Sequence, residues 1–391
     1  MTRYRKNSLY SRLSKILSYI RKHRVLATFT VVLGACLVLI ALLASGCALR
    51  SQPVGWSGAA CSDSNIFVAS IEGRLFGFDK QDGKPLWQSY QLDSSNDGVA
   101  VYSTPAVYND LVYLAGYDGR VFTISIESGY RGLVFPDNDS LKPIIGGLTV
   151  SGGKVFFGCN DGNVYCLNAD ELRKEWEFPT GDRIWSKPVI SEDTLFVSSF
   201  DNNIYALDAS DGSEIWRFEA EGAFASTPLI HDDTVYAGSF DRHVYALDAT
   251  NGKLKWRSEV EADKWFWTQV VAHNDIIYAP NLDGKIYILN SDNGYEVDDP
   301  VELDGPISSS PVVVGDDIIV ASQQGNVYAI DTANNRTGSP IFNVAEDEVI
   351  NAPLCASDGI IYIHAQSSKH DKLYAFDTET RREVWAPVSL S

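Results

Sequence analysis

Short runs of alternating apolar and polar residues repeat through most of the chain. Residues 226–260 show the pattern, because the runs at 234–238 and 243–247 are separated by short segments containing Asp, Asn or Gly. The runs have the length and the β-branched and aromatic content of strands, and the separators have the residues of tight turns. No segment after residue 50 keeps a helical period. One unit therefore predicts a four-stranded antiparallel meander, with strands A to D in chain order.

The unit recurs eight times. In 201–216 and 241–256 an aromatic residue in strand C lies 11 residues before a Trp, and the same frame finds Phe76, Phe122, Tyr165, Tyr205, Tyr245, Tyr287, Tyr328 and Tyr374. Their spacings of 40 to 46 residues are typical of repeat proteins. Eight meanders packed radially predict an all-β, eight-bladed β-propeller over residues 56–391, in which the C-terminal segment itself supplies the last strand.

The first fifty-five residues have a different character. Residues 1–24 carry eight Lys or Arg and no acid, as expected of a basic cytoplasmic region, and residues 25–49 are uncharged. The uncharged segment predicts a hydrophobic helix, long enough to serve as a transmembrane anchor. It ends in LLASGC, which resembles the lipobox of bacterial lipoproteins, where Cys47 would be lipidated. A lipoprotein signal, an uncleaved signal anchor and a buried core helix remain alternatives, and residues 50–55 form a short linker.

The charge of the remaining chain limits the choice of partners. Beyond residue 24 there are 24 basic and 51 acidic residues, a net charge of −27. Phosphate backbones repel such a domain, so nucleic acid is a poor partner.

The frame AxDxxxGxxxW carries a family resemblance. It reads Ala206-Asp208-Gly212-Trp216 and Ala246-Asp248-Gly252-Trp256, while Leu133, Asp298, Ser339 and Arg381 depart from it. The frame resembles the tryptophan-docking repeat of propellers of the pyrroloquinoline quinone (PQQ) type. With the export signal, the whole chain is similar to the BamB-type lipoproteins of outer-membrane assembly. The resemblance implies a structural role for these residues: Ala leaves room on strand C, Gly permits a positive φ, and Trp covers the gap between blades.

The resemblance also raises the question of a quinone dehydrogenase. Those enzymes hold the cofactor between a Trp and a disulfide of adjacent cysteines, with Ca²⁺ bound by Glu, Asn and Asp, and this chain has no adjacent Cys pair. The repeated acids Asp118, Asp161, Asp201, Asp241 and Asp283 all fall in B–C turns, where turn chemistry explains them. His231 and His273 fit surface A–B turns better than a metal site. We therefore expect no catalytic residue, no metal and no cofactor.

Cys61 and Cys355 occupy the same repeat position in the first and last blades, which are neighbours in a closed ring. Other blades have small apolar residues in this slot. Since packed sheets lie about 10 Å apart, beyond the roughly 7 Å Cα limit of a disulfide, apolar filling is the favoured interpretation. A ring-locking disulfide is the alternative.

The column three residues before the strand A proline position is irregular. It reads Trp56, Tyr102, Ile145, Trp185, Ala225, Trp267, Ser308 and Ile350, while the next column is small and mostly hydroxylic, as crowding near the axis requires. Aromatic residues beside scattered charge indicate an interaction surface. The predicted partner-binding rim is Trp56, Tyr102, Arg183, Trp185, Lys264, Trp265, Phe266 and Trp267; the alternative is that these rings only fill space between blades.

These observations predict a membrane-tethered, extracytoplasmic and monomeric propeller that acts as a non-enzymatic scaffold. Residues 48–55 reach at most about 28 Å, so the face carrying the D–A and B–C loops is expected near the membrane. Its partner would be a protein at or in the membrane. The alternative function is a ligand sensor or a quinone-binding domain, with the ligand in the channel.

Overall fold

A computed structural model describes residues 55–92, 99–368 and 370–390. The basic segment 1–24, the hydrophobic segment 25–49 with Cys47, and residues 50–54 of the linker lie outside the described residues, and so does the predicted N-terminal helix. In the described part, no helix is long and apolar enough to cross a membrane.

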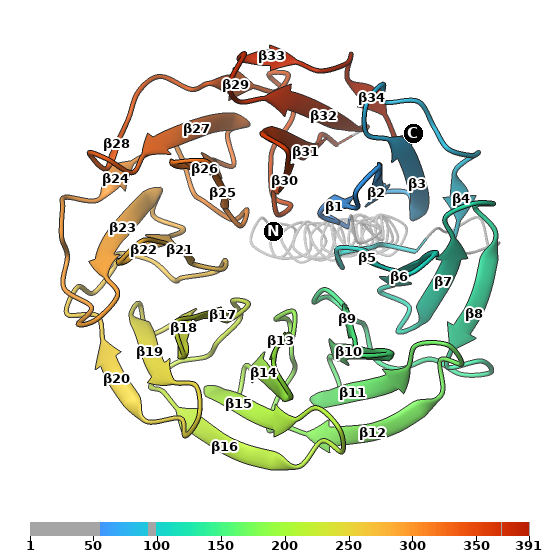
Figure 1. Cartoon of the computed structure of the whole chain (residues 1–391), viewed down its shortest axis with the longest axis horizontal. Helices are drawn as coiled ribbons and strands as arrows, with labels where there is room; N and C mark the ends of the chain where they lie inside the picture. Colours follow the sequence, from blue (N-terminus) through green and yellow to red (C-terminus); the bar gives the residue numbers. More distant parts are fainter. Residues whose placement is uncertain (1–54, 93–98, 369, 391) are drawn as a thin grey trace, which may run out of the picture. The chain divides into compact units, whose positions relative to one another are not determined.

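Eight antiparallel sheets are arranged in a ring, each with its first strand innermost (Figure 1). Within every sheet the strands follow chain order from the axis outward, so each sheet is one meander. This confirms the eight-bladed propeller of four-stranded blades. We number the blades 1 to 8 along the chain.

The bounds of the strands follow the repeat closely. Blades 1 to 4 contain β1 (Ala60–Cys61), β2 (Asn65–Ala69), β3 (Arg74–Asp79) and β4 (Tyr90–Gln91); β5 (Ala106–Tyr108), β6 (Leu111–Ala115), β7 (Val121–Ser125) and β8 (Arg131–Phe135); β9 (Thr149–Ser151), β10 (Lys154–Gly158), β11 (Asn163–Asn168) and β12 (Lys174–Pro179); β13 (Val189–Ser191), β14 (Thr194–Ser198), β15 (Asn203–Asp208) and β16 (Glu214–Glu219). Blades 5 to 8 contain β17 (Leu229–His231), β18 (Thr234–Gly238), β19 (Val244–Asp248) and β20 (Leu254–Arg257); β21 (Val271–His273), β22 (Ile276–Pro280), β23 (Lys285–Asn290) and β24 (Val301–Glu302); β25 (Val312–Val314), β26 (Asp317–Ala321), β27 (Asn326–Asp331), β28 (Arg336–Thr337) and β29 (Phe342–Asn343); β30 (Cys355–Ser357), β31 (Ile360–Gln366), β32 (Asp371–Asp377), β33 (Arg382–Glu383) and β34 (Val388–Ser389).

In the last two blades the outermost strand consists of two short pieces. In blade 8, β33 and β34 both pair with β32. The C-terminal segment therefore completes its own blade, as the sequence predicts, and this sheet takes no strand from the described N-terminal residues.

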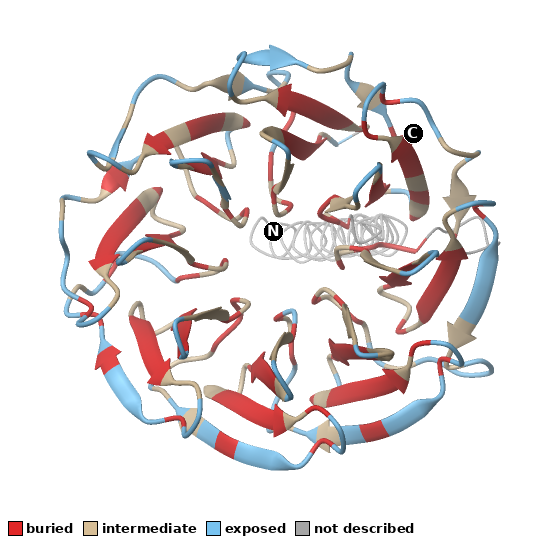
Figure 2. Ribbon diagram, in the orientation of Figure 1, coloured by how far each residue is buried: buried red, intermediate tan, exposed pale blue. Residues whose placement is uncertain are grey.

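Burial follows position in the blade. Strands B and C are almost entirely buried, whereas β12 and β16 are largely exposed apart from a buried band (Figure 2). Trp176 and Trp216 are the buried residues of these two edge strands. A strand inside a blade packs on both faces, and the outermost strand packs mainly where its Trp turns toward the next blade.

Each such Trp docks on the C–D turn of the following blade. The indole N–H of Trp216 donates to the carbonyl of Ala249 at 2.9 Å, and that of Trp256 donates to Ser291 at 2.7 Å. Trp87, Trp176 and Trp385 make the same bond to Ile126, Ala209 and Lys80. Because Trp385 reaches from blade 8 to blade 1, the same contact also closes the ring.

A glycine lies under every docked ring. A Cβ added to Gly212 would lie 2.6 Å from the ring of Trp176, and the equivalent distances at the other docked turns are 2.5 to 2.7 Å, at Gly83, Gly129, Gly252 and Gly294. In the three blades that follow a blade without a docking Trp, the position holds Leu172, Asn335 and Arg381. All eight residues have a positive φ, between 46° and 76°. The left-handed turn therefore tolerates other residues, and the Gly is required by the ring above it.

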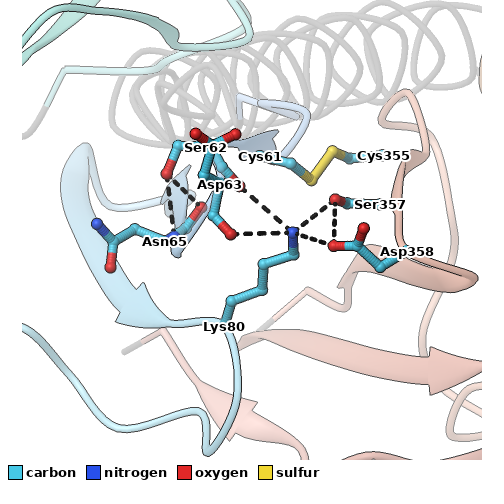
Figure 3. Close-up of a disulfide and its surroundings, with 8 residues drawn as sticks. All are labelled: Cys61, Ser62, Asp63, Asn65, Lys80, Cys355, Ser357 and Asp358. Carbon is cyan, nitrogen blue, oxygen red and sulfur yellow. Dashed lines mark hydrogen bonds and ion pairs between the residues drawn. A yellow bond between two sulfur atoms is a disulfide. The ribbon is translucent and has the colours of Figure 1, made fainter.

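The seam between blades 8 and 1 carries a disulfide between Cys61 and Cys355 (Figure 3). The sequence-based preference for apolar filling is wrong here, because the innermost strands β1 and β30 converge near the axis and bring the two Cα atoms to 6.6 Å. The 10 Å spacing applies between the broad faces of sheets, not at their inner edges.

Polar contacts reinforce this seam. The Lys80 ammonium forms an ion pair with Asp358 at 2.7 Å and donates to the hydroxyl of Ser357 and to two backbone carbonyls of blade 1 (Figure 3). Deeper in the seam, fully buried His364 bonds both the Ser57 carbonyl and Asp371. Blades 8 and 1 are thus joined by a covalent bond, an ion pair and a buried hydrogen-bond network.

Replacing Gly212 by Ala tests the docking contact. We expect the change to destabilise the fold by about 1–3 kcal/mol through overpacking against Trp176, in addition to the cost of the left-handed backbone. Gly359 is the matched control, since it has a φ of 78° and nothing within 4 Å of an added Cβ. Denaturant unfolding of Gly212→Ala and Gly359→Ala measures the difference. Equal losses of stability in the two variants would show that the ring contributes nothing.

Candidate binding surface at the channel mouth

The D–A connections and the B–C turns lie on one face of the ring, and backbone hydrogen bonds tie them together. Phe200 N–H donates to the Arg183 carbonyl, Phe240 N–H to Ala223, and Leu282 N–H to Trp265, at 2.9 to 3.3 Å. Each bond joins a B–C turn to the D–A connection of its own blade. The sequence predicted that these loops share a face, and this ladder fixes the side chains that project from it.

An aromatic cluster, here called the aromatic rim, extends across this face from blade 4 to blade 6. It comprises Arg183, Trp185, Phe200, Phe240, Trp265 and Trp267. Its ring centroids lie 4.6 to 5.9 Å apart, with Phe240 stacked on Trp265 at 4.6 Å and an interplanar angle of 12°. Such spacing is that of favourable aromatic pairs. Blades 4 and 6 are connected directly by the Trp185–Trp267 pair and also through Phe200 and Phe240.

A cation caps one end of the aromatic rim. The Arg183 guanidinium lies 4.4 Å from the ring centre of Phe200 and 4.8 Å from that of Trp185. Arg183 is exposed, and Trp265 retains 50% exposure. Large aromatic surfaces with an arginine on the outside of a protein are typical of protein-binding sites.

The other predicted rim residues divide into three groups. Trp56 and Tyr102 pair edge to face at 4.5 Å, and Tyr102 contacts Tyr117, forming a smaller cluster in blades 1 and 2. Lys264 is exposed beside Trp265. Phe266 was wrongly assigned to the rim, because it is fully buried against Gly238 and Tyr287.

The assignment of Phe266 was wrong because it belongs to a different sequence column, the one immediately before the column of Trp185 and Trp267. This preceding column holds apolar, fully buried side chains in six blades: Val101, Ile144, Ile184, Phe224, Phe266 and Ile307. These residues and the docking tryptophans fill the space between blades. The sequence itself shows this column, because the position is apolar in most repeats. Since successive side chains of an extended segment alternate, burial of Phe266 turns Trp265 and Trp267 outward.

The inner strands surround an axial cavity of about 420 Å³. Its wall has two tiers. The first contains Trp56, Tyr102, Trp185 and Trp267, together with Ile145, Ala225 and Ser308, and the second, two residues further along, contains Thr104, Gly147, Lys187, Thr227, Gln269 and Ser310. Ile350 is the exception, because it is buried in the wall. The four aromatic residues thus line the channel, and the alternative that they fill between blades is not what the structure shows.

The small hydroxylic column between the two tiers points into the wall. Ser103, Ser186, Ser226 and Ser309 are buried and donate to a strand B carbonyl twelve residues later, at 2.6 to 3.1 Å. The expected structural role is confirmed, and its chemical reason is added: the hydroxyl satisfies a buried carbonyl that the strand ladder leaves unpaired.

The repeated turn aspartates also have a structural role. Asp201 accepts the N–H of Asn203 on one oxygen and the hydroxyl of Tyr205 on the other, at 3.0 and 2.7 Å. Asp161, Asp241 and Asp283 repeat both bonds. Their carboxylates are therefore engaged within the turn.

One group of potential metal ligands occurs in the described part of the chain, formed by Asp347, Glu348 and His370. Glu348 is buried, and its carboxylate already contacts the Lys372 ammonium at 2.7 Å, the Tyr374 hydroxyl at 2.6 Å and His370 at 3.3 Å. The ammonium neutralises the charge that a cation would need. His231 and His273 lie elsewhere, at the ends of β17 and β21.

The cavity does not fit PQQ bound through Ca²⁺. Among the described residues that line it, none carries a carboxylate. The nearby disulfide joins cysteines 294 positions apart rather than adjacent ones. A Ca²⁺ site needs several oxygen ligands, usually including carboxylates, so the donors required for that mode of binding are missing from this wall.

Sequence reasoning missed Phe200, Phe240 and Lys187. Phe200 and Phe240 each precede the turn aspartate, in the repeated tripeptide Ser-Phe-Asp. Tyr117 holds this position in blade 2, and other blades have Ile71, Asn160, Leu282 or Gln323 there. An aromatic residue at this turn position in blades 2, 4 and 5 was a usable signal.

The fold, the docked tryptophans and the axial channel define an eight-bladed propeller of the PQQ-like, tryptophan-docking class. The chain belongs to the family described as outer membrane protein assembly factor BamB, whose model matches residues 45–183 and 161–387.

Individual relatives are more distant. Outer membrane protein assembly factor BamB of Escherichia coli (strain K12) is 30% identical over 93 residues, which cover 22% of this chain and 24% of that protein, and the protein of that name from Shigella dysenteriae serotype 1 gives the same values. The crystal structure of BamB from Moraxella catarrhalis has a TM-score of 0.67 at 19% identity, over 79% of this chain and 92% of that chain. A computationally designed protein, Ika8, has a TM-score of 0.68 at 15% identity, over 82% and 96% of the two chains. These structural matches show the fold alone.

The raised pKa values of buried tyrosines predict that the protein loses stability at high pH. Burial, and then the hydrogen bond to the aspartate, raise the pKa of Tyr165, Tyr205, Tyr245 and Tyr287, and burial raises that of Tyr278 and Tyr362 to about 12. The raised pKa values contribute to the free energy of unfolding. This contribution is complete below about pH 10, the pKa of tyrosine in the unfolded chain, and is lost as pH rises through the pKa values of the folded protein.

Thermal unfolding at pH 8 and pH 11, with tyrosinate absorbance followed in parallel, measures this effect. We expect a lower melting temperature at pH 11 and a group of phenols that ionise only on unfolding. Ionisation of every tyrosine near pH 10 in the folded protein would contradict it. Tyr205→Phe should make the melting temperature less dependent on pH.

Proposed function

We propose that this protein is a membrane-tethered, extracytoplasmic scaffold that binds a protein partner through the aromatic rim. The observation that carries the proposal is the continuous cluster from Arg183 to Trp265, which leaves aromatic surface and a cation exposed on one face. Interfaces gain most of their affinity from such residues. The role in outer-membrane assembly that the names of its relatives state is consistent with a partner of this kind.

The proposed location rests on three observations. Residues 25–49 are uncharged and follow a basic segment, which directs the rest of the chain outward. The LLASGC sequence would add a lipid at Cys47, or the segment would remain as an anchor. A disulfide between Cys61 and Cys355 suits an oxidising compartment. The short linker would hold the rim face near the membrane, where a membrane-embedded partner is accessible.

The proposal assigns no catalytic activity and no nucleic-acid partner to the propeller. The rim residues act by contact: stacked rings offer area without much loss of side-chain freedom, and Arg183 offers a charge for a carboxylate or carbonyl on the partner. We propose that the propeller acts as a monomer. A sensor role for the axial cavity is the second candidate, and its volume is the observation that favours it.

Pull-down from solubilised membranes tests the rim. We expect Trp265→Ala, alone or with Arg183→Ala, to lower the recovery of the membrane partner at least tenfold, since hot-spot residues each contribute about 2 kcal/mol or more. Leu254→Ala is the matched control, because Leu254 is 48% exposed on an outer strand and Trp265 is 50% exposed on the rim. Equal recovery with the rim variants and the control would contradict the proposal, provided that the melting temperatures are unchanged.

A further inference from the structure

The second tier of the axial cavity carries a single charge. Among the described residues that line the cavity, Lys187 is the only one with a positively charged side chain. The other second-tier residues are Thr, Ser, Gln and Gly. The rest of the chain beyond residue 24 is strongly acidic. Six other blades have Thr, Ser, Gly or Ala in this column, and the seventh has Gln269. Packing of the ring therefore does not require a lysine here, at the axis of an acidic domain and next to aromatic rings.

The local geometry presents the Lys187 side chain to the cavity. Its stem lies over blade 3, where an added Cβ on Gly147 would be 3.1 Å from Cδ, so the glycine leaves room for it. Its backbone N–H donates to the Thr227 hydroxyl at 3.1 Å, which leaves the hydroxyl hydrogen to donate to a ligand. In the described part of the chain, no ion pair or hydrogen bond engages the Lys187 ammonium.

Lys187 is exposed within the cavity yet enclosed by the surrounding blades. This removal from bulk water lowers the pKa of its ammonium group. An enclosed charge without a counter-charge is unfavourable, and an anion that enters the cavity would relieve the cost.

The single positive charge of Lys187 and the aromatic wall of the cavity restrict the chemical class of the ligand. One ammonium compensates one negative charge, so a dianion such as phosphate would carry an uncompensated charge into the cavity. Trp56, Tyr102, Trp185 and Trp267 offer apolar and aromatic contacts to the body of a ligand. The volume of about 420 Å³ falls within the roughly 300 to 1,000 Å³ of small-molecule sites.

We propose that the axial cavity binds a monocarboxylate with an apolar or aromatic body, whose carboxylate pairs with Lys187 and accepts from Thr227. The carboxylate comes either from a free small molecule or from the C-terminus of a polypeptide. This site shares Trp185 and Trp267 with the aromatic rim, but it does not include Trp265 and does not require the partner that the rim binds.

Titration calorimetry on the purified full-length chain in detergent tests the site. The probes are N-acetyl-L-tryptophan and its amide, which differ only in the carboxylate. We expect the acid to bind at least tenfold more tightly than the amide. Lys187→Met should abolish this preference, Lys187→Arg should restore it, and Lys253→Met, at an exposed turn, should leave it intact. Trp265→Ala should also leave it intact, which separates this site from the rim.

A tripeptide ending in Trp, with a free or an amidated C-terminus, distinguishes the two sources. Tighter binding of the free peptide than of N-acetyl-L-tryptophan identifies a chain terminus, and the reverse order identifies a small molecule. Equal affinities for acid and amide, or the same preference in Lys187→Met with an unchanged melting temperature, would overturn the proposal. Absence of saturable binding of either acid at millimolar concentration would overturn it as well.

Discussion

The contact between each docking Trp and the next C–D turn is the constraint on which the rest of the structure depends. An isolated four-stranded sheet of this size cannot bury its faces, so each blade needs its neighbours. The indole ring supplies apolar area, its N–H fixes the position of the next blade by one hydrogen bond, and glycine allows the ring to lie flat on the backbone. Five of the eight blade junctions use this contact, and one of them closes the ring.

Ring closure requires more than this contact. The other junctions join blades that are consecutive in the chain, whereas blades 8 and 1 are joined only by contacts across the seam. That seam contains the disulfide, the Lys80–Asp358 ion pair and the buried His364–Asp371 pair. Closing so long a loop costs conformational entropy, which a covalent bond removes from the unfolded state. The concentration of polar and covalent contacts at this one junction follows from the topology.

The sequence alone was sufficient for the fold, the blade number and the C-terminal closure, because the strand C aromatic residue recurs in all eight repeats and the docking Trp in five of them. It was insufficient where a residue's role depends on a neighbour in another blade. Gly212 was interpreted through its φ, although Leu172 and Arg381 adopt the same backbone, and the ring of Trp176 is the actual reason. The disulfide was the less favoured alternative because it was judged by the spacing between sheet faces, which does not apply at their inner edges. Phe266 was misplaced because it belongs to a column of residues that is apolar and buried in six blades.

Functionally, the regular and irregular parts of the repeat have different roles. Positions that recur in most blades serve packing, as the hydroxyls of Ser186 and Ser226 and the turn aspartates show. Positions that vary between blades lie on one face, where they form the aromatic rim, or in the axial cavity, where Lys187 lies. A scaffold of this kind can change its surface without changing its packing, because loops tolerate substitution more readily than the core.

Site-specific photocross-linking in intact cells tests most directly the claim that the rim face meets a membrane partner. A photoreactive phenylalanine analogue would be placed at position 265 on the rim and at position 254 on an outer strand, two sites of nearly equal exposure. The account predicts adducts with a membrane-embedded protein from position 265 and none from position 254. Equal adducts from both positions, or adducts from position 265 with soluble proteins alone, would contradict it.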